Sequence, residues 1–223
     1  MIEIIATTVK DALEIEAGGA NRVELVSVLE EGGLTPSHKV MSEVINAVDI
    51  PVNVMIRPHA DSFVYTDDEI AFMRKEIETA RMLGANGVVL GVLTENNTID
   101  TKKLEKLLSA CCGLEVTFHR AIDETDVVAS VKQLAVYKEI TNILTSGGLT
   151  APLSENVEII NNMIASAAHI NILLGGGLTK ENVISVARKT KAMNFHFGSA
   201  VQTEGNVVKE KVEVLVNKIQ NAL

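Results

Sequence analysis

The sequence predicts a single-domain (β/α)8 TIM barrel that takes up residues 1–223. The length of 223 residues lies within the range that one α/β barrel normally occupies. Short apolar, β-branched runs alternate with longer segments of helical periodicity along the chain, which is typical of βα units around a parallel sheet. No break in composition and no charge block interrupts this series, so we place no domain boundary.

Eight apolar runs predict eight strands, each followed by a segment with helical periodicity. The strands are expected at 2–5, 22–25, 52–56, 87–90, 116–119, 142–145, 171–174 and 194–197. The helices are expected at 9–17, 37–48, 66–83, 101–111, 125–138, 154–168, 180–192 and 205–221. A closed barrel fits eight such units better than an open doubly wound sheet, whose Gly-x-Gly-x-x-Gly turn after the first strand is absent here.

Short sequence echoes support the repetition of one structural unit. Gly-Ala-Asn precedes the second and fourth predicted strands, at 19–21 and 84–86, where the glycine ends a helix. Gly-Gly-Leu-Thr occurs at 32–35, 147–150 and 176–179, each time between a predicted strand and a predicted helix.

The composition argues against several classes of partner. The net charge is −9 and aromatic residues make up 3% with no Trp, so the chain lacks both a basic surface and stacking platforms for nucleic acid. No apolar stretch approaches the ~20 residues that span a bilayer. The amino terminus has no basic segment before its apolar run, which carries Glu3, so it does not resemble a signal peptide. We expect a cytoplasmic protein with no nucleic-acid or membrane partner.

The two cysteines, Cys111 and Cys112, are adjacent in a predicted helix. They cannot form a disulfide framework, which suits a reducing compartment. Adjacent helical residues point about 100° apart, so the pair would chelate one metal ion poorly, and we interpret both as small packed side chains.

Ionisable side chains gather on the inner face of the predicted barrel. Alternate residues of a barrel strand face the interior or the helices, and a polar interior residue near the carboxyl end of a strand lies at the mouth. With the apolar residues placed against the helices, the interior set is Glu3, Glu24, Arg57, His119 and His196.

Buried ionisable groups must pair with one another or serve a ligand. The candidate catalytic residues, which include two that follow the fifth strand, are Glu24, Arg57, His119, Arg120 and Asp123. Two structural alternatives stay open. Glu3 could form an interior salt bridge with Arg57, and His196 could be a core histidine whose hydrogen bonds are satisfied within the chain.

Glycine-rich turns follow the last three predicted strands. Many barrels bind a phosphate after strands seven and eight, through backbone N–H groups and the N-terminus of a short helix. The candidate cofactor-binding or anion-binding residues are Ser146, Gly147, Gly175, Gly176, Gly177, Gly198 and Ser199. The alternative is that these glycines only form tight turns.

These residues lie within a sequence that resembles the CutC family of copper homeostasis proteins. The matching stretches are 24–25, 32–37, 55–58, 87–91, 117–123, 144–147 and 175–177. The strings Thr-Phe-His-Arg-Ala and Met-Ile-Arg-Pro are the most specific. The resemblance implies a barrel fold, cytoplasmic copper handling, and assembly into homodimers or larger homo-oligomers. It is imperfect at Ile5 and Val26, where many relatives have Cys.

Two functions are compatible with these observations, and the fold alone does not decide between them. The resemblance implies a copper-binding or copper-handling protein, although Cu(I) prefers sulfur ligands and the mouth offers only Met55 of that kind. The polar mouth instead favours an enzyme acting on a small phosphorylated or carboxylated metabolite by general acid–base chemistry. In that case Arg57 and Arg120 assist anion binding, and His119 or Glu24 moves a proton. The expected ligand is thus a small-molecule anion or a copper ion, and the sequence identifies no metal ligands.

Overall fold

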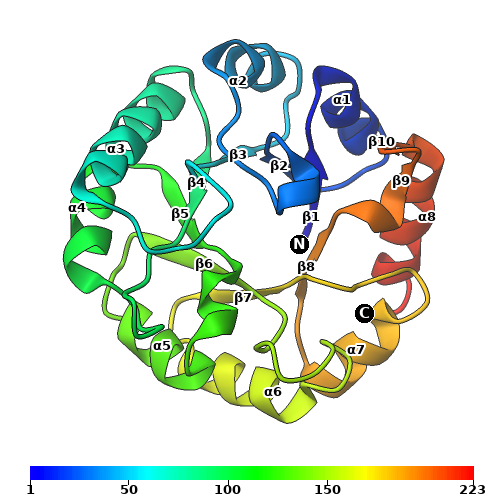
Figure 1. Cartoon of the computed structure of the whole chain (residues 1–223). Coiled ribbons are helices and arrows are strands. Elements are labelled where there is room, and N and C mark those ends of the chain that lie inside the picture. Colours follow the sequence, from blue (N-terminus) through cyan, green and yellow to red (C-terminus); the bar gives the residue numbers. More distant parts are fainter.

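The computed structural model describes residues 1–223 and shows eight parallel strands closed into one barrel (Figure 1). Each strand pairs with its neighbours in chain order, and β8 closes the ring by pairing with β1. The strands are β1 (Ile2–Ala6), β2 (Arg22–Leu25), β3 (Val52–Met55), β4 (Gly87–Leu90), β5 (Glu115–Phe118), β6 (Ile140–Thr145), β7 (Asn171–Leu174) and β8 (Asn194–Phe197). The predicted (β/α)8 TIM barrel is confirmed.

Eight α-helices alternate with the strands and form the outer ring seen in Figure 1. They are α1 (Val9–Ala17), α2 (His38–Ile45), α3 (Asp67–Met82), α4 (Thr101–Cys111), α5 (Val127–Leu134), α6 (Val157–Ser166), α7 (Val183–Thr190) and α8 (Lys209–Gln220). Short 3₁₀ helices follow three of the strands, and these are η1 (Leu29–Glu31), η2 (Arg120–Glu124) and η3 (Ser199–Val201). A small hairpin of β9 (Gln202–Thr203) and β10 (Asn206–Val207) precedes α8.

Three late helices begin three or four residues after their predicted starts, at Val157, Val183 and Lys209. Before α6, the side-chain amide of Asn156 donates to carbonyl groups of the preceding loop, which keeps that loop folded back on itself. Before α8, the hairpin turn at Gly205, with φ +78°, occupies the predicted first helical turn. The later starts of α6 and α8 thus arise from loop contacts that the helical periodicity does not encode.

The alternation of side chains along the strands separates an apolar layer from a polar interior. One large hydrophobic cluster fills the space between strands and helices and includes Ile4 and Phe118, neither of which is exposed. A second, small cluster consists of Val26, Met55 and Val89. Most other side chains that point into the barrel are polar, including those of Glu3, Glu24, Asn53, Thr117 and His196.

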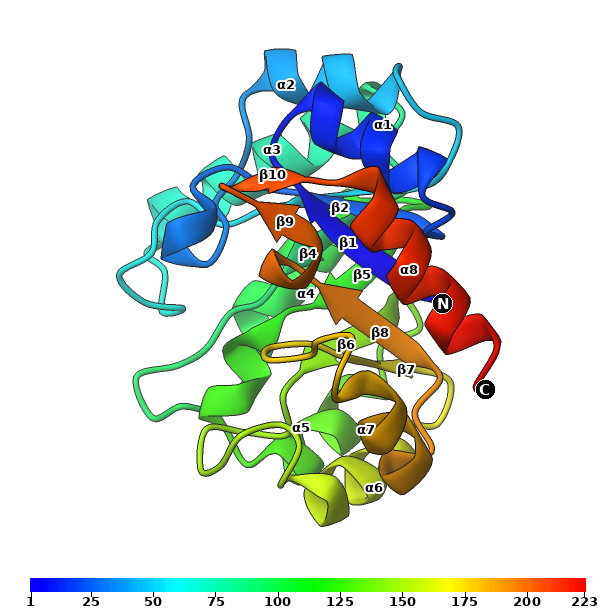
Figure 2. The same ribbon diagram turned by 90° about the vertical axis from the view of Figure 1, so that its right-hand side faces the viewer.

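The carboxyl ends of the strands open toward the loops on one end of the barrel. Figure 2 shows these loops, including the 3₁₀ helix η1, at the end opposite to both chain termini. This arrangement brings the loops after β2, β3, β5, β6, β7 and β8 around a common mouth. None of the helices is long and apolar enough to cross a membrane.

We predict that Phe118→Ala lowers the free energy of unfolding by about 3–5 kcal/mol, because it removes a fully buried ring between β5 and the helices. Phe72→Ala on α3 is the matched control, since that ring is 44% exposed and its loss should cost about 1 kcal/mol or less. Urea denaturation of the two variants measures the difference. Equal losses would show that the layer between strands and helices is not the main core.

Candidate functional site

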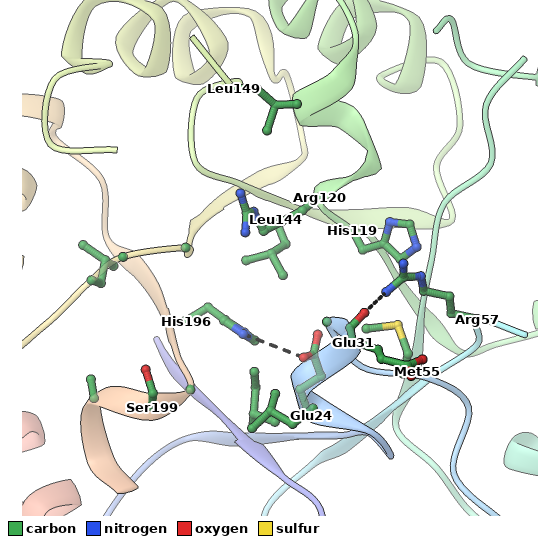
Figure 3. A pocket seen from close by; sticks show the side chains of 18 of the residues that line it. Glu24, Glu31, Met55, Arg57, His119, Arg120, Leu144, Leu149, His196 and Ser199 are labelled. Carbon is green, nitrogen blue, oxygen red and sulfur yellow. Dashed lines mark hydrogen bonds and ion pairs between the residues drawn. The ribbon is translucent and has the colours of Figure 1, made fainter. Parts of the chain in front are cut away.

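A cavity of about 500 Å³ occupies the mouth of the barrel (Figure 3). Its walls carry four of the five candidate catalytic residues, and these are Glu24, Arg57, His119 and Arg120. They also carry four of the candidate anion-binding residues, Gly176, Gly177, Gly198 and Ser199, together with His196. Asp123, Ser146, Gly147 and Gly175 do not line the cavity.

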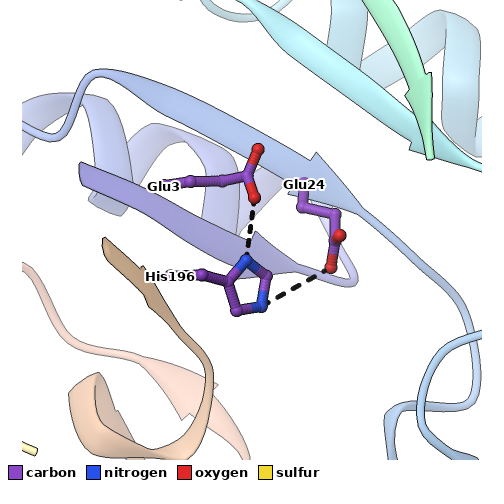
Figure 4. A group of neighbouring side chains, drawn as sticks. All are labelled: Glu3, Glu24 and His196. Carbon is purple, nitrogen blue, oxygen red and sulfur yellow. Dashed lines mark hydrogen bonds and ion pairs between the residues drawn. The ribbon is translucent and has the colours of Figure 1, made fainter. Parts of the chain in front are cut away.

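A chain of buried ion pairs crosses the barrel interior beneath one side of this cavity. Arg22 Nε donates to Glu3 Oε2 at 2.5 Å, and Arg22 Nη1 lies 3.2 Å from Glu115 Oε2. Glu3 Oε1 lies 2.8 Å from Nδ1 of His196, and Nε2 of His196 lies 3.7 Å from Oε2 of Glu24 (Figure 4). Four of these five side chains come from the adjacent strands β8, β1 and β2.

The partner of Glu3 is therefore Arg22, and the interior salt bridge considered between Glu3 and Arg57 is not formed. Arg22 was not among the residues predicted to face the interior. The signal was available, because Arg22 and Glu24 flank Val23 and so share its opposite face. The alternative that His196 is a core histidine holds only in part. Its Nδ1 is hydrogen-bonded to Glu3, but the ring also lines the cavity.

This chain sets the protonation of its members. Burial raises the pKa of Glu24 to about 7, and the carboxylate of Glu3 adds to the increase. Burial would also raise the pKa of Glu3, but Arg22 and His196 hold it below its ordinary value. Burial would lower the pKa of His196, yet the carboxylates of Glu24 and Glu3 raise it above its ordinary value. Oε1 of Glu24 is buried and has no hydrogen-bond partner.

Arg57 forms the opposite wall and anchors two loops. Its Nη1 donates to the carbonyl oxygens of Glu31 at 2.9 Å and Gly33 at 3.3 Å, and Nη2 donates to that of Ala60 at 3.2 Å. The guanidinium also lies 4.9 Å from the ring centroid of Phe63. Most donors of Arg57 are thus hydrogen-bonded to the loops after β2 and β3, and only Nε is without a partner.

His119 lies beside Arg57 as a neutral imidazole. Its Nδ1 accepts from the backbone N–H of Ala121 at 3.2 Å, so the proton of the neutral ring is on Nε2. Burial, assisted by Arg57 and then Arg120, lowers the pKa of His119 to about 3. Nε2 has no partner within the chain. The neutral ring can donate a hydrogen bond from Nε2, and a pKa of about 3 does not suit the proton-transfer role that the sequence suggested for His119.

Asp123 has a structural environment. Its carboxylate, 1% exposed, accepts from Arg120 Nε at 2.9 Å, from the Ser146 backbone N–H and hydroxyl, and from the N–H of Gly148. The hydroxyl of Thr145 donates to it as well. With so many internal donors and no surface on the cavity, Asp123 organises the loop after β6, and its predicted catalytic role lacks geometric support.

The same contacts explain why Ser146 and Gly147 do not contribute to an anion site. The N–H of Ser146 is directed to Asp123, and that of Gly147 donates to the hydroxyl of Thr145 at 2.9 Å. Gly175 is also engaged, because its N–H donates to the Thr145 carbonyl at 3.0 Å. These three residues support the neighbouring loops from behind the cavity.

The loops after β7 and β8 present free backbone donors to the cavity. The N–H groups of Gly176, Gly177, Leu178 and Gly198 have no acceptor within the chain, and all four residues line the cavity. Gly176 and Gly177 have φ of +89° and +103°, a conformation that favours glycine. A Cβ at Gly176 would lie 2.8 Å from Cζ of Arg120, so a larger residue would displace the guanidinium from this point.

Arg120 approaches these donors with part of its guanidinium uncommitted. Nε is bonded to Asp123, and Nη2 donates to the hydroxyl of Ser146 at 3.2 Å. Nη1 has no partner within the chain, and the side chain is 44% exposed. The fixed edge orients the guanidinium, and the free nitrogen is available to a ligand.

The donor set of the mouth does not fit Cu(I). Glu3, Glu24 and His196 offer ligand atoms within 4.8 Å of one another, but Glu3 is already bound by Arg22 and His196. One imidazole nitrogen and one carboxylate remain, with Met55 as the only sulfur on the cavity wall. Cu(I) prefers thiolate and thioether ligands.

The cysteines lie at the end of α4, on the outer ring. Cys111 is buried, and its burial raises the pKa of the thiol to about 12, whereas Cys112 is exposed. Neither lines the cavity.

The chain is similar to known proteins over most of its length. The family model described as the CutC family matches residues 1–201. A human protein named copper homeostasis protein cutC homolog is 39% identical over 198 residues, covering 88% of this chain and 72% of the human protein. The family protein CutC of Xanthomonas axonopodis pv. citri is 38% identical over 196 residues, covering 87% of this chain and 81% of its own length.

A solved structure gives the same assignment. The crystal structure of the CutC protein from Streptococcus agalactiae superposes with a TM-score of 0.84 at 36% identity, covering 91% of this chain and 99% of that one. The match thus extends to sequence and to the whole fold. The chain belongs to the CutC family.

Proposed function

We propose that the chain is an enzyme that binds a small phosphorylated or carboxylated metabolite in the barrel mouth and acts on it by general acid–base chemistry. One observation carries this proposal. One cavity of about 500 Å³ is lined both by residues with unpaired backbone N–H groups and by Glu24, whose carboxyl group has no hydrogen-bond partner and a pKa of about 7. This volume is within the range of about 300–1,000 Å³ found for small-molecule sites.

In this proposal the anion binds at the loops after β7 and β8. Unpaired N–H groups cost free energy unless an acceptor meets them. The four residues with such groups all line this cavity, and they are Gly176, Gly177, Leu178 and Gly198. Arg120 adds a charged donor beside Gly176. Arg57 is a weaker candidate for this role than the sequence suggested, because its guanidinium is occupied by loop carbonyl groups.

The proton is moved by Glu24. A general acid or base is most effective when its pKa is close to the working pH, and burial brings Glu24 into that range. The Nε2–H of His119, on another wall of the cavity, is positioned to donate a hydrogen bond to a ligand oxygen. The cavity thus combines an anion-binding part, at the loops after β7 and β8, with a proton-transferring group, Glu24.

A role in copper homeostasis is a second candidate, supported by the names of the human and mouse relatives. A Cu(I) ion held in the barrel fits this role poorly, because the cavity wall has one sulfur donor. A cytoplasmic location and assembly into homo-oligomers stay predictions.

We expect inorganic phosphate or sugar phosphates at millimolar concentration to raise the melting temperature of the wild-type protein. A ligand that binds only the folded state stabilises it by ~2.7 kcal/mol at a hundredfold excess over Kd. Gly177→Asp should abolish this gain, since a carboxylate would repel the anion and a Cβ at this position meets no atom within 4 Å. Differential scanning fluorimetry measures both proteins.

Gly205→Asp is the matched control for this substitution. Gly205 also has a positive φ, of +78°, and a Cβ there meets no atom within 4 Å, but the residue lies outside the cavity. This variant should keep the full phosphate response. If neither phosphate esters nor carboxylates stabilise the wild type, the anion-binding part of the proposal is wrong.

The stability of the protein should fall as the pH rises through 7 because Glu24 ionises. The pKa of Glu24 in the folded state, about 7, lies above its ordinary value of 4.5. The stabilisation that protonation of Glu24 gives the folded state is therefore fully present below pH 4.5 and is lost as the pH rises through 7. Glu24→Gln should gain stability relative to wild type between pH 5 and pH 8.5, on the order of 2–3 kcal/mol.

Urea denaturation at several pH values tests this, with Glu78→Gln on α3 as the control. Glu78 is exposed, so its substitution should change stability by the same small amount at each pH. A constant difference between Glu24→Gln and wild type across this range would contradict the assignment of Glu24 as the titrating group.

We expect Cu(I) to bind weakly. Titration under reducing conditions against a competing chelator should reveal no tight stoichiometric site in the wild type, because Cys111 and Cys112 lie away from the cavity and Met55 is alone. Any residual binding should disappear in the Cys111→Ser, Cys112→Ser double variant. A tight site that survives in this variant would show that the barrel mouth binds copper.

A further inference from the structure

We propose that His196 is a second proton carrier of the cavity, that its Nε2 exchanges a proton with Glu24 or with the ligand, and that Glu3 is the positioning residue that orients it. The catalytic role of this proton exchange rests on the proposed function. Its geometry can be tested in the free protein, without any ligand.

The contact with Glu3 decides which nitrogen of His196 is free. Arg22 lies 2.5 Å from Oε2 of Glu3, and this buried pair keeps the carboxylate ionised. An ionised carboxylate only accepts hydrogen bonds, so Nδ1 of His196, 2.8 Å from Oε1, must carry a proton. Nε2 is left as the atom that gains or loses one.

Nε2 is directed toward Glu24. It lies 3.7 Å from Oε2, which is too long for a direct hydrogen bond but close enough for a strong electrostatic interaction (Figure 4). Both side chains line the cavity, so a ligand atom can approach either of them. Nε2 of His196 and both carboxyl oxygens of Glu24 thus have no hydrogen-bond partner within the chain.

The backbone leaves room for this placement of the ring. A Cβ at Gly175 would lie 3.0–3.1 Å from atoms of His196 and 2.7 Å from Leu144. Glycine after β7 therefore leaves room for the side chain of His196 beside the strand end. Gly175 has a role in the site even though it does not bind the anion.

The charged groups around the pair favour a shared proton. Glu3 from β1 and Arg22 from β2 lie below the pair of His196 and Glu24, and their opposite charges offset each other. Glu115 from β5 lies beyond Arg22. Arg57 and the neutral His119 line the cavity from other strands, and Arg120 lies over Gly176. Glu24 has a pKa of about 7, and that of His196 is raised above its ordinary value by Glu24 and Glu3 despite burial. Two ionisable groups that interact at this distance take up protons as a pair.

The pair provides one acid and one base at neutral pH. A proton accepted from one ligand atom by the base can be matched by a proton given to another atom by the acid, with no net change in the protonation of the enzyme. This exchange moves no electrons and requires no co-reactant.

The test is a two-dimensional ¹H–¹⁵N spectrum of the imidazole rings in protein labelled with [¹⁵N]histidine, recorded between pH 5 and pH 9. We expect His196 to show a protonated Nδ1 and an unprotonated Nε2 at high pH. Its titration curve should have two steps, because Glu24 titrates beside it. Glu24→Gln should leave one step and move it to lower pH by about one unit or more, since it removes a negative neighbour.

His169 serves as an internal control, because it is exposed just before β7 at the opposite end of the barrel. At each pH its signals should be the same in the wild type and in Glu24→Gln. Glu3→Gln is a second variant, and it should lower the midpoint of His196 and populate the tautomer with Nε2 protonated.

A wild-type spectrum with Nε2 of His196 protonated at high pH would overturn the proposal, and so would a His196 titration that Glu24→Gln leaves unchanged. Either result could occur while phosphate still stabilises the protein, so failure of this inference is distinguishable from failure of the proposed function. Because Glu24→Gln keeps the Glu3–Arg22 pair, the test holds even if Glu3→Gln does not fold.

Discussion

The ion pair between Glu3 and Arg22 is the interaction on which the chemistry of the barrel interior depends. A buried carboxylate needs a partner, and there is one arginine at this level for two glutamates. Glu3 takes it and stays ionised, which leaves its second oxygen for His196. Glu24 receives neither an arginine nor a short hydrogen bond, so its neutral form is favoured. Two glutamates from adjacent strands thereby acquire opposite roles, one as a fixed charge and one as a group that changes protonation.

The sequence was sufficient for the fold and for the orientation of strand residues, but not for the choice of partners. A period of two places Glu24, Arg57 and His119 on the inner face, and all three line the cavity. The pairing of Glu3 with Arg22 depends on the register between β1 and β2, in which the two residues are directly opposite. Register is a property of two strands together, so it could not be read from the pattern of one.

Loop residues were the least predictable part of the site for a related reason. Arg57 and Asp123 were both placed near the mouth from their positions after strands, yet their polar atoms are used by the loops themselves. A charged side chain at a strand end either serves a ligand or satisfies nearby backbone groups, and its residue type does not distinguish the two uses. Gly176 and Gly177 differ because nothing in the chain competes for their N–H groups.

The carboxylate of Asp123 has a consequence for ligand binding that concerns entropy. It occupies the donors of Ser146 and Gly148 in the way that an external anion would, but it is tethered to the same chain and so acts at a high effective concentration. The loop after β6, which carries Leu149 on the cavity wall, is therefore already ordered before a ligand binds. The conformational entropy of that loop is lost during folding. The free energy of ligand binding therefore does not include the cost of ordering it.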